Sequence, residues 1–162
     1  MNKKQSNKAR GPDEQLLDRP TALDVVSEYV AALAVGDNER MNSCCSPDFV
    51  LDAVSDDAFE SGPLSLEEMR DFWPSWFMAF PEMDYEVTRT IAAEEVVVTE
   101  WIFTGTNSEP LLPPIFPQRR PATGRTIRLR GVSIYDVSEG LIQRETSYMD
   151  LATLMVELGV EL

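Results

Sequence analysis

A carboxylate and a phenol near the end of the chain, Asp150 and Tyr148, are close enough in the sequence to act together in proton transfer. Asp150 stands between a strand-like stretch, residues 141–149, and a helix-like stretch that stops at Gly159. Tyr148 precedes it by two residues. Removing a proton beside a carbonyl group needs a base near the C–H and a hydrogen-bond donor near the oxygen. Asp150 as general acid/base and Tyr148 as donor meet both needs if they face an apolar pocket, which would raise the carboxyl pKa.

Asp150 also has a purely structural explanation. It directly precedes an apolar series at helical spacing, Leu151, Leu154, Met155 and Leu158, so its side chain can cap the first turn of a helix. A cap and a catalytic group can coexist at one position. Tyr148, likewise, can be a core tyrosine whose hydroxyl is hydrogen-bonded.

A second acid lies inside an otherwise apolar strand, residues 49–54 (FVLDAV). Alternation places Asp52 on the face opposite Phe49 and Leu51. Asp52 is therefore a candidate second catalytic acid or hydrogen-bond partner. It can equally be a solvent-facing or hydrogen-bonded strand residue.

Large aromatic side chains are numerous enough to wall a pocket for a ring-shaped ligand. The alternative for each is ordinary packing in the core. The candidate substrate-binding residues are Tyr29, Phe49, Trp73, Trp76, Phe77, Trp101 and Phe103.

Helix and strand signals then give the elements that must position these groups. Thr21 with Asp24, and Ser65 with Glu68, have the spacing of capping boxes and start two helices. A short helix follows Asn38, and Pro74 should kink or interrupt the helix that Ser65 opens. Strands are predicted over residues 49–54, 83–91, 96–106, 125–137 and 141–149.

This order predicts an α+β fold, a curved antiparallel sheet wrapped over N-terminal helices with a short C-terminal helix. Such a sheet leaves a conical pocket between itself and the long helix. One domain covers residues 20–162, and residues 1–19 form a disordered N-terminal tail. The loop over residues 107–122 contains five prolines and is either a lid or a dimer contact.

Composition excludes several classes of function. The 162 residues carry a formal net charge of −14, which argues against nucleic acid and anionic membrane surfaces as partners. There is no histidine, and the adjacent Cys44 and Cys45 lack metal-ligand spacing, so no metal site is expected. Two packed thiols and the absence of a membrane-length apolar run favour the cytoplasm.

Several short motifs, in this order, carry a family resemblance over about residues 21–160. They include Ser46-Pro47-Asp48-Phe49-Val50, Phe80-Pro81-Glu82-Met83 and Pro121-Ala122-Thr123-Gly124-Arg125. Gly140-Leu141-Ile142, Tyr148, Asp150 and Glu157-Leu158-Gly159 follow in the expected order. The chain resembles the SnoaL-like polyketide cyclases of the NTF2-like superfamily, which also contains ketosteroid isomerase and limonene epoxide hydrolase.

The resemblance implies a homodimer with one apolar pocket per subunit. It also implies an aspartate that acts as general acid/base in an intramolecular aldol closure without metal or cofactor, and Asp150 best matches that acid. The chain departs from the family at three places: Asn107 and Asp52 stand where histidines are frequent, and Arg144-Glu145-Thr146 stands where Glu-His-Trp is common.

The function that follows is that of a cofactor-free isomerase or cyclase acting on a hydrophobic cyclic or polyketide-like carbonyl compound. A non-catalytic ligand-binding module, or a dimeric assembly module of the same shape, is the alternative.

Overall fold

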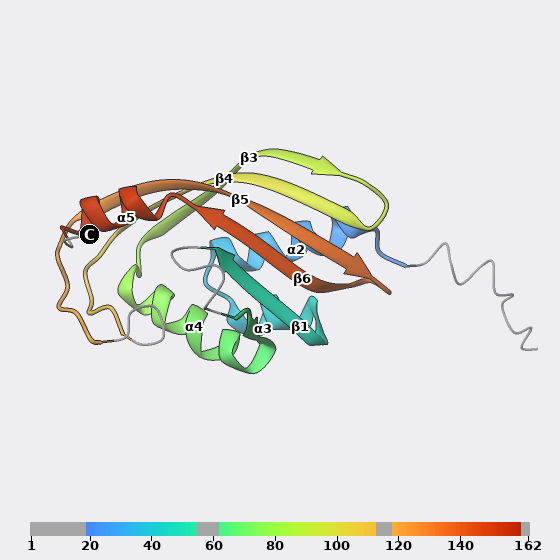
Figure 1. The fold of residues 1–162 in the computed structure, drawn as a ribbon, viewed down its shortest axis with the longest axis horizontal. Coiled ribbons are helices and arrows are strands. Elements are labelled where there is room, and N and C mark those ends of the chain that lie inside the picture. The colour runs from blue at the N-terminus through green and yellow to red at the C-terminus, as the bar shows by residue number, and fades with distance from the viewer. Residues whose placement is uncertain (1–18, 55–61, 113–117, 160–162) are drawn as a thin grey trace, which may run out of the picture.

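A single mixed sheet, bent over the helices, builds the molecule (Figure 1). The computed structural model describes residues 19–54, 62–112 and 118–159. Within them the strands are β1 (Cys45–Val54), β2 (Leu64–Ser65), β3 (Met83–Ala92), β4 (Val96–Thr106), β5 (Thr126–Ser138) and β6 (Leu141–Met149). The helices are α2 (Ala22–Ala34), α3 (Asn38–Ser43), α4 (Leu66–Ala79) and α5 (Leu151–Leu158).

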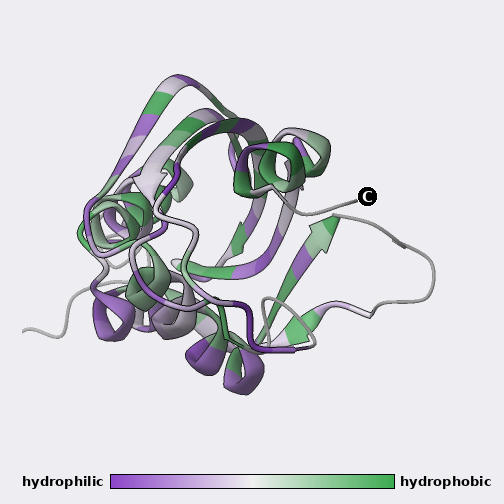
Figure 2. Cartoon of the chain, turned by 90° about the vertical axis from the view of Figure 1, so that its left-hand side faces the viewer, coloured by the Kyte–Doolittle hydropathy of each residue, from purple (hydrophilic) through white to green (hydrophobic). Residues whose placement is uncertain are grey.

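The strand order is β2-β1-β6-β5-β4-β3. All neighbours run antiparallel except β1 and β6, which are parallel. This confirms the α+β cone and adds a parallel pair to the expected antiparallel sheet. Seen from the end of the molecule, the strands curl into an open trough with α5 at one rim (Figure 2).

Both predicted capping boxes are present. The Thr21 hydroxyl accepts from the Asp24 amide at 3.2 Å, and the Asp24 carboxylate accepts from the Thr21 amide at 2.9 Å. Ser65 and Glu68 repeat this exchange at the start of α4. Each box satisfies amide groups that a helix start otherwise leaves unpaired.

Pro74 does not divide α4, which continues through it as one helix. A proline has no amide hydrogen, so it leaves the carbonyl of Arg70, four residues earlier, without its helical donor. The side-chain amide of Asn38, on α3, donates to that carbonyl at 3.4 Å. A tertiary contact thus compensates for the local interruption that the sequence predicts.

A β-bulge in β6 decides which side chains face the helices. Val137 pairs with Ile142 but Asp136 pairs with Arg144, so Gln143 is an extra residue without an opposite partner. An extra residue shifts the alternation by one. After the bulge, Glu145 and Ser147 are buried beneath the sheet.

The core fills the concave side of the sheet in two adjoining clusters. One cluster packs α2 and α3 against β1, the start of β4 and the end of β5. The other packs α4 and α5 against the later part of β4 and the start of β5. The side chains of Trp73, Phe77 and Tyr85 border both clusters. The space between the clusters is where a pocket can form.

Asn107 fastens the loop that follows β4. Its buried amide donates to the carbonyls of Ala79 (3.3 Å) and Glu109 (2.8 Å), and its Oδ1 accepts from the backbone and hydroxyl of Thr123 at 2.8 and 3.1 Å. Leu111 and Arg120 close the loop by two backbone hydrogen bonds. Residues 113–117 of the proline-rich loop, and all of the predicted tail except Arg19, lie outside the described residues.

No helix within the described ranges is long and apolar enough to cross a membrane. The same residues contain no group of three or more acidic or cysteine side chains placed to hold a metal ion.

Candidate functional site

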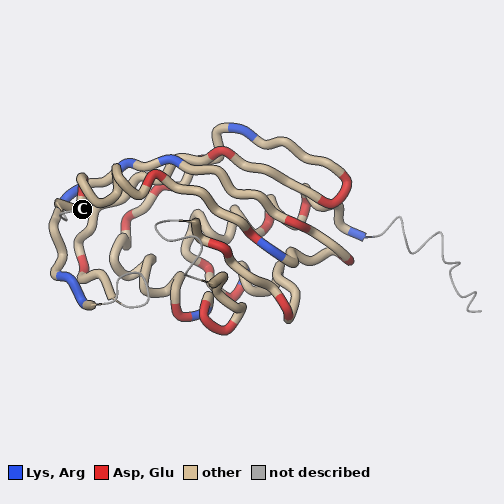
Figure 3. Tube along the Cα trace, in the orientation of Figure 1, with Lys and Arg blue, Asp and Glu red and all other residues tan. Residues whose placement is uncertain are grey.

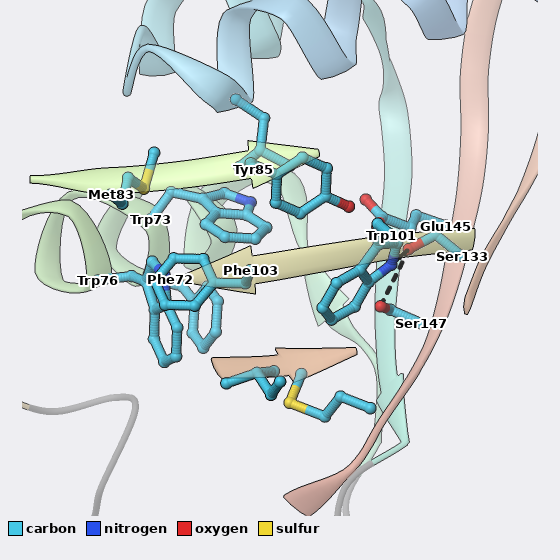
Figure 4. A pocket seen from close by; sticks show the side chains of 13 residues that line it. Phe72, Trp73, Trp76, Met83, Tyr85, Trp101, Phe103, Ser133, Glu145 and Ser147 are labelled. Atoms are coloured by element: carbon cyan, nitrogen blue, oxygen red, sulfur yellow. Dashed lines mark hydrogen bonds between the residues drawn. The ribbon is translucent and has the colours of Figure 1, made fainter. Parts of the chain in front are cut away.

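A cavity lies between α4 and the concave face of the sheet (Figure 4). It encloses about 530 Å³ of space, its open mouth included. Its wall is mostly aromatic and aliphatic. The described lining residues are Leu33, Phe72, Trp73, Trp76, Met83, Tyr85, Trp101, Phe103, Leu129, Ser133, Glu145, Ser147 and Met149.

Glu145 is the only acidic side chain among these lining residues. It is 3% exposed, and its Oε2 accepts a hydrogen bond from the Tyr29 hydroxyl at 2.9 Å. Burial raises the pKa of the Glu145 carboxyl to about 7, although the hydroxyls of Tyr29, Ser133 and Tyr135 favour the charged form and act in the opposite direction. A carboxyl group with such a pKa can both take and release a proton near neutral pH.

Hydroxyl groups surround this carboxyl. The Ser133 and Ser147 hydroxyls lie 3.0 Å apart, and the indole Nε1–H of Trp101 donates to Ser133 at 3.0 Å. Figure 4 shows the Tyr85 hydroxyl pointing towards Glu145. Burial, with the nearby acid, raises the pKa of Tyr85 well above its ordinary value, so this phenol stays protonated and can donate.

Gly131 makes room for the indole of Trp101, its direct neighbour across β4 and β5. A β-carbon at position 131 would stand 2.3 Å from Cζ2 of Trp101 and 2.5 Å from the Tyr148 carbonyl oxygen. Any larger residue would therefore displace the indole. The glycine sets the position of this wall of the cavity.

The structure brings four of the seven predicted aromatic residues to the cavity: Trp73, Trp76, Trp101 and Phe103. Tyr29 does not line it but contacts its acid, Glu145. Phe49 is packed in the core beside α2 and α3. Phe77 supports the wall from behind, stacked on Trp73 with ring centroids 5.7 Å apart.

Asp150 lies outside the cavity, on the exposed outer side of the sheet. It is the N-cap of α5: its carboxylate accepts from the Thr153 amide (3.0 Å) and hydroxyl (2.7 Å). The hydroxyl contact and then the amide contact lower the pKa of Asp150. The expectation of a raised pKa at this carboxyl is therefore wrong, and the capping alternative describes the geometry.

Tyr148 and Asp52 are also absent from the described cavity lining. Tyr148 is 49% exposed. Asp52 forms an ion pair with Arg144 on the outer side of β1 and β6. Tyr148 and Asp150 instead line a separate hollow on the outer face of the sheet, and Asp52 lies apart from both.

Sequence reasoning missed Glu145 because unbroken alternation from the buried Ile142 puts it on the solvent side. The bulge at Gln143 reverses that assignment. A signal was available in the family comparison, since Arg144-Glu145-Thr146 occupies the place of the common Glu-His-Trp. Asn107, another position at which the chain departs from the family, secures the loop that follows β4.

The family model of the SnoaL-like domain matches residues 26–145. The chain belongs to this family. A search of curated proteins finds no match.

Solved structures share the fold of this SnoaL-like protein. A SnoaL-like polyketide cyclase candidate from Jannaschia sp. CCS1 aligns with a TM-score of 0.72 at 15% identity, over 96% of this chain and 100% of the other. AclR, a candidate hydroxylase from Streptomyces galilaeus, gives 0.71 at 22% identity, covering 85% and 95%. IdmH, a candidate polyketide cyclase from Streptomyces antibioticus, gives 0.68 at 24% identity, covering 86% and 99%.

Proposed function

We propose that this SnoaL-like protein is an enzyme that moves a proton on a hydrophobic, ring-containing carbonyl compound, as an isomerase or a polyketide cyclase does. Glu145 is the general acid/base. The observation that carries the proposal is a buried carboxyl group in the wall of an aromatic cavity, with a pKa raised to about 7. The structural neighbour IdmH, a candidate polyketide cyclase, supports a small-molecule substrate of this kind.

The chemistry follows from the groups around Glu145. Its carboxylate takes a proton from the carbon beside the substrate carbonyl, and the protonated phenol of Tyr85 donates to the oxygen of the resulting enolate. In an isomerisation Glu145 returns the proton to another carbon. In a cyclisation the enolate carbon adds to a second carbonyl of the same molecule, and Glu145 gives its proton to that oxygen. Neither the isomerisation nor the cyclisation, written in this way, includes a step at a metal or a cofactor.

Glu145 replaces Asp150, Tyr148 and Asp52 in this proposal, because those three side chains are not part of the cavity lining. A non-catalytic ligand-binding or assembly module remains the second candidate. The hydrogen bond from Tyr29 to Oε2 favours it, since a carboxyl that is already paired can serve structure alone.

Proton exchange on 2-tetralone tests the proposal without knowledge of the natural substrate. This two-ring ketone has acidic C–H bonds beside its carbonyl, and its binding is first established by calorimetry. In D₂O, loss of the α-proton NMR signals should be roughly a hundredfold faster with the native protein than with Glu145→Gln. The native rate should rise with pH through about 7, as the carboxylate forms.

Asp150→Asn serves as the matched control, because it changes an acid outside the cavity and should keep the native rate. Equal rates for the native protein and Glu145→Gln would overturn the catalytic role. Binding of 2-tetralone without any acceleration of exchange would favour the ligand-binding module.

We also propose that the protein is a homodimer that associates through the outer face of its sheet. Partly exposed apolar side chains gather on the central strands of that face, at Val98, Ile102, Val132, Ile134 and Tyr148. These side chains keep partial exposure, whereas the described helices pack on the concave face. Glu100 lies among these side chains, opposite Val132. Partly exposed apolar surface of this kind is typical of interfaces.

A reducing compartment such as the cytoplasm is the proposed location. Cys44 and Cys45 are both free and buried, and burial raises the pKa of the Cys45 thiol, so these side chains serve packing and not disulfide chemistry.

A further inference from the structure

A buried phenol on α2 contacts the acid of the cavity from behind. Tyr29 is 0% exposed, and its hydroxyl donates to Oε2 of Glu145 at 2.9 Å. A second acceptor, the sulfur of Met69, lies 4.0 Å from this hydroxyl, but a thioether accepts hydrogen bonds only weakly. The hydrogen bond is therefore directed at the carboxyl group.

The phenol is held in place and keeps its proton. Its ring meets that of Tyr135 edge-on, with centroids 5.8 Å apart and planes at 67°, and Tyr29 belongs to the core cluster that packs α2 and α3 against β1. Burial, and then the neighbouring Glu145, raise the pKa of Tyr29 well above its ordinary value. Tyr29 is thus a fixed donor throughout the pH range in which Glu145 titrates.

Other groups that face Glu145 come from three further strands, and the described ones are neutral near pH 7. They are Cys45 on β1, Tyr85 on β3, and Ser133 and Tyr135 on β5. Burial raises the pKa of the thiol and of both phenols. Glu145 is therefore the group of this cluster that gains and loses a proton.

The contact with Tyr29 restrains this carboxyl in two ways. A glutamate carboxyl otherwise turns easily about its last torsion, and a hydrogen bond to one oxygen stops that rotation. A hydrogen bond to a charged acceptor is also stronger than one to a neutral acceptor, so the contact is tightest when Glu145 is ready to take a proton. Tyr29 is absent from the described lining of the cavity, and it acts on a ligand only through Glu145.

We propose that Tyr29 is a positioning residue, whose hydroxyl holds the Glu145 carboxylate in one orientation at the cavity wall for proton transfer. This inference rests on the proposed function, because it takes Glu145 to be the acid/base. It gives the buried contact a role in the reaction and not in structure alone.

Titration of Glu145 tests the contact without ligand or turnover. ¹³C NMR of protein labelled at the glutamate carboxyl carbons follows the signal that is absent from Glu145→Gln. Its midpoint should lie near 7 in the native protein and about one pH unit higher in Tyr29→Phe, because the carboxylate loses a charge-assisted hydrogen bond. Tyr148→Phe is the matched control, since it removes a phenol hydroxyl on the outer face and should titrate as the native protein does.

Proton exchange on 2-tetralone then separates orientation from basicity. The native protein and Tyr29→Phe are compared at a pH above both midpoints, where each carboxylate is fully formed. A stronger base alone would exchange the protons faster, whereas loss of orientation should make Tyr29→Phe roughly 3- to 10-fold slower. The affinity for 2-tetralone should stay unchanged, because Tyr29 is not among the described lining residues.

Tyr29→3-fluorotyrosine is the second variant. It keeps the ring and the hydroxyl and makes the hydroxyl a stronger donor, so the midpoint of Glu145 should fall below the native value. A folding defect of Tyr29→Phe therefore cannot hide the result.

An unshifted midpoint in both variants would overturn the inference, and so would a Tyr29→Phe exchange rate equal to or above the native rate. If the native protein still shows exchange that depends on Glu145, the inference alone has failed. A shifted midpoint without such exchange would instead overturn the proposed function, and Tyr29 would then hold a structural carboxylate.

Discussion

Glu145 and Asp150 are five residues apart in the chain, yet their surroundings impose opposite protonation behaviour. Glu145 lies under the sheet, where loss of water raises the carboxyl pKa to about 7. Asp150 is exposed and accepts two hydrogen bonds from Thr153, which lower its pKa. Only the first environment suits proton transfer near neutral pH. The environment, and not the residue type, therefore separates an acid/base from a cap.

The buried acid should make stability depend on pH in a predictable direction. The pKa of Glu145 is about 7 in the folded state, against about 4.3 for an unfolded glutamate. The folded state then binds more protons in this window, and the native protein should lose stability relative to Glu145→Gln as pH rises from about 4 to 8. The loss should be about 4 kcal/mol at most, measured by urea unfolding at a series of pH values.

The stability of the native protein relative to Asp150→Ala should change with pH in the opposite direction. A capping carboxylate with a lowered pKa stabilises the folded state above the unfolded pKa of about 3.9. This advantage disappears as the pH falls through the folded pKa. A pH-independent difference between the native protein and Glu145→Gln would show that Glu145 is not a buried, titrating acid.

At the scale of elements, one loop depends on a single side chain. Asn107 joins the end of α4, through Ala79, to Glu109 and Thr123 in the loop. Asn107→Ala should lower the free energy of unfolding by about 2–3 kcal/mol, because several buried hydrogen bonds are lost together. Thermal and urea unfolding would measure the change.

Thr123→Val is the matched control for this loop. It removes the exposed hydroxyl that bonds Asn107 Oδ1 and the Arg125 amide, but keeps the backbone hydrogen bond to Asn107. Its effect should be well below that of Asn107→Ala. Similar effects of the two substitutions would mean that the hydroxyl, and not the amide, secures the loop.

The elements themselves could be predicted because their signals are local. Thr21, Ser65 and Asp150 cap the three longer helices where the sequence indicates, and Gly159 ends α5 with the positive φ of 73° that glycine tolerates. The strand over Val96–Thr106 was predicted with its observed bounds. Each of these follows from residues within one or two turns.

The position of the candidate acid could not be predicted in the same way. It depends on one bulge at Gln143, which has no strong sequence signature and reverses the faces of every residue after it. The parallel pairing of β1 with β6 joins segments about 90 residues apart, and no local pattern indicates it. The bulge also explains why Tyr148, which alternation would place at the pocket, is exposed on the outer face.

At the scale of the whole molecule, the two faces of the sheet differ in what covers them. The concave face is packed against the helices. On the convex face the side chains of Arg128 and Arg130 are exposed to solvent. The apolar side chains of Val98, Val132 and Ile134 lie at the centre of that face, beside Glu100. Acidic residues are spread over the rest of the chain (Figure 3), and the net charge of −14 opposes association in general. Apolar contact must therefore supply the attraction in the proposed dimer.

Ile134→Arg tests that dimer at the centre of the convex face, where Ile134 lies between Val98 and Thr146 on neighbouring strands. We expect the native protein to sediment as a dimer and the variant as a monomer, since a buried unpaired guanidinium cannot be accommodated. Val35→Arg is the control, because Val35 is 72% exposed just after α2, away from the sheet. Both substitutions reduce the net negative charge and so weaken repulsion between subunits equally. A monomer found only for Ile134→Arg would thus reflect lost apolar contact, and a native protein that sediments as a monomer would rule the interface out.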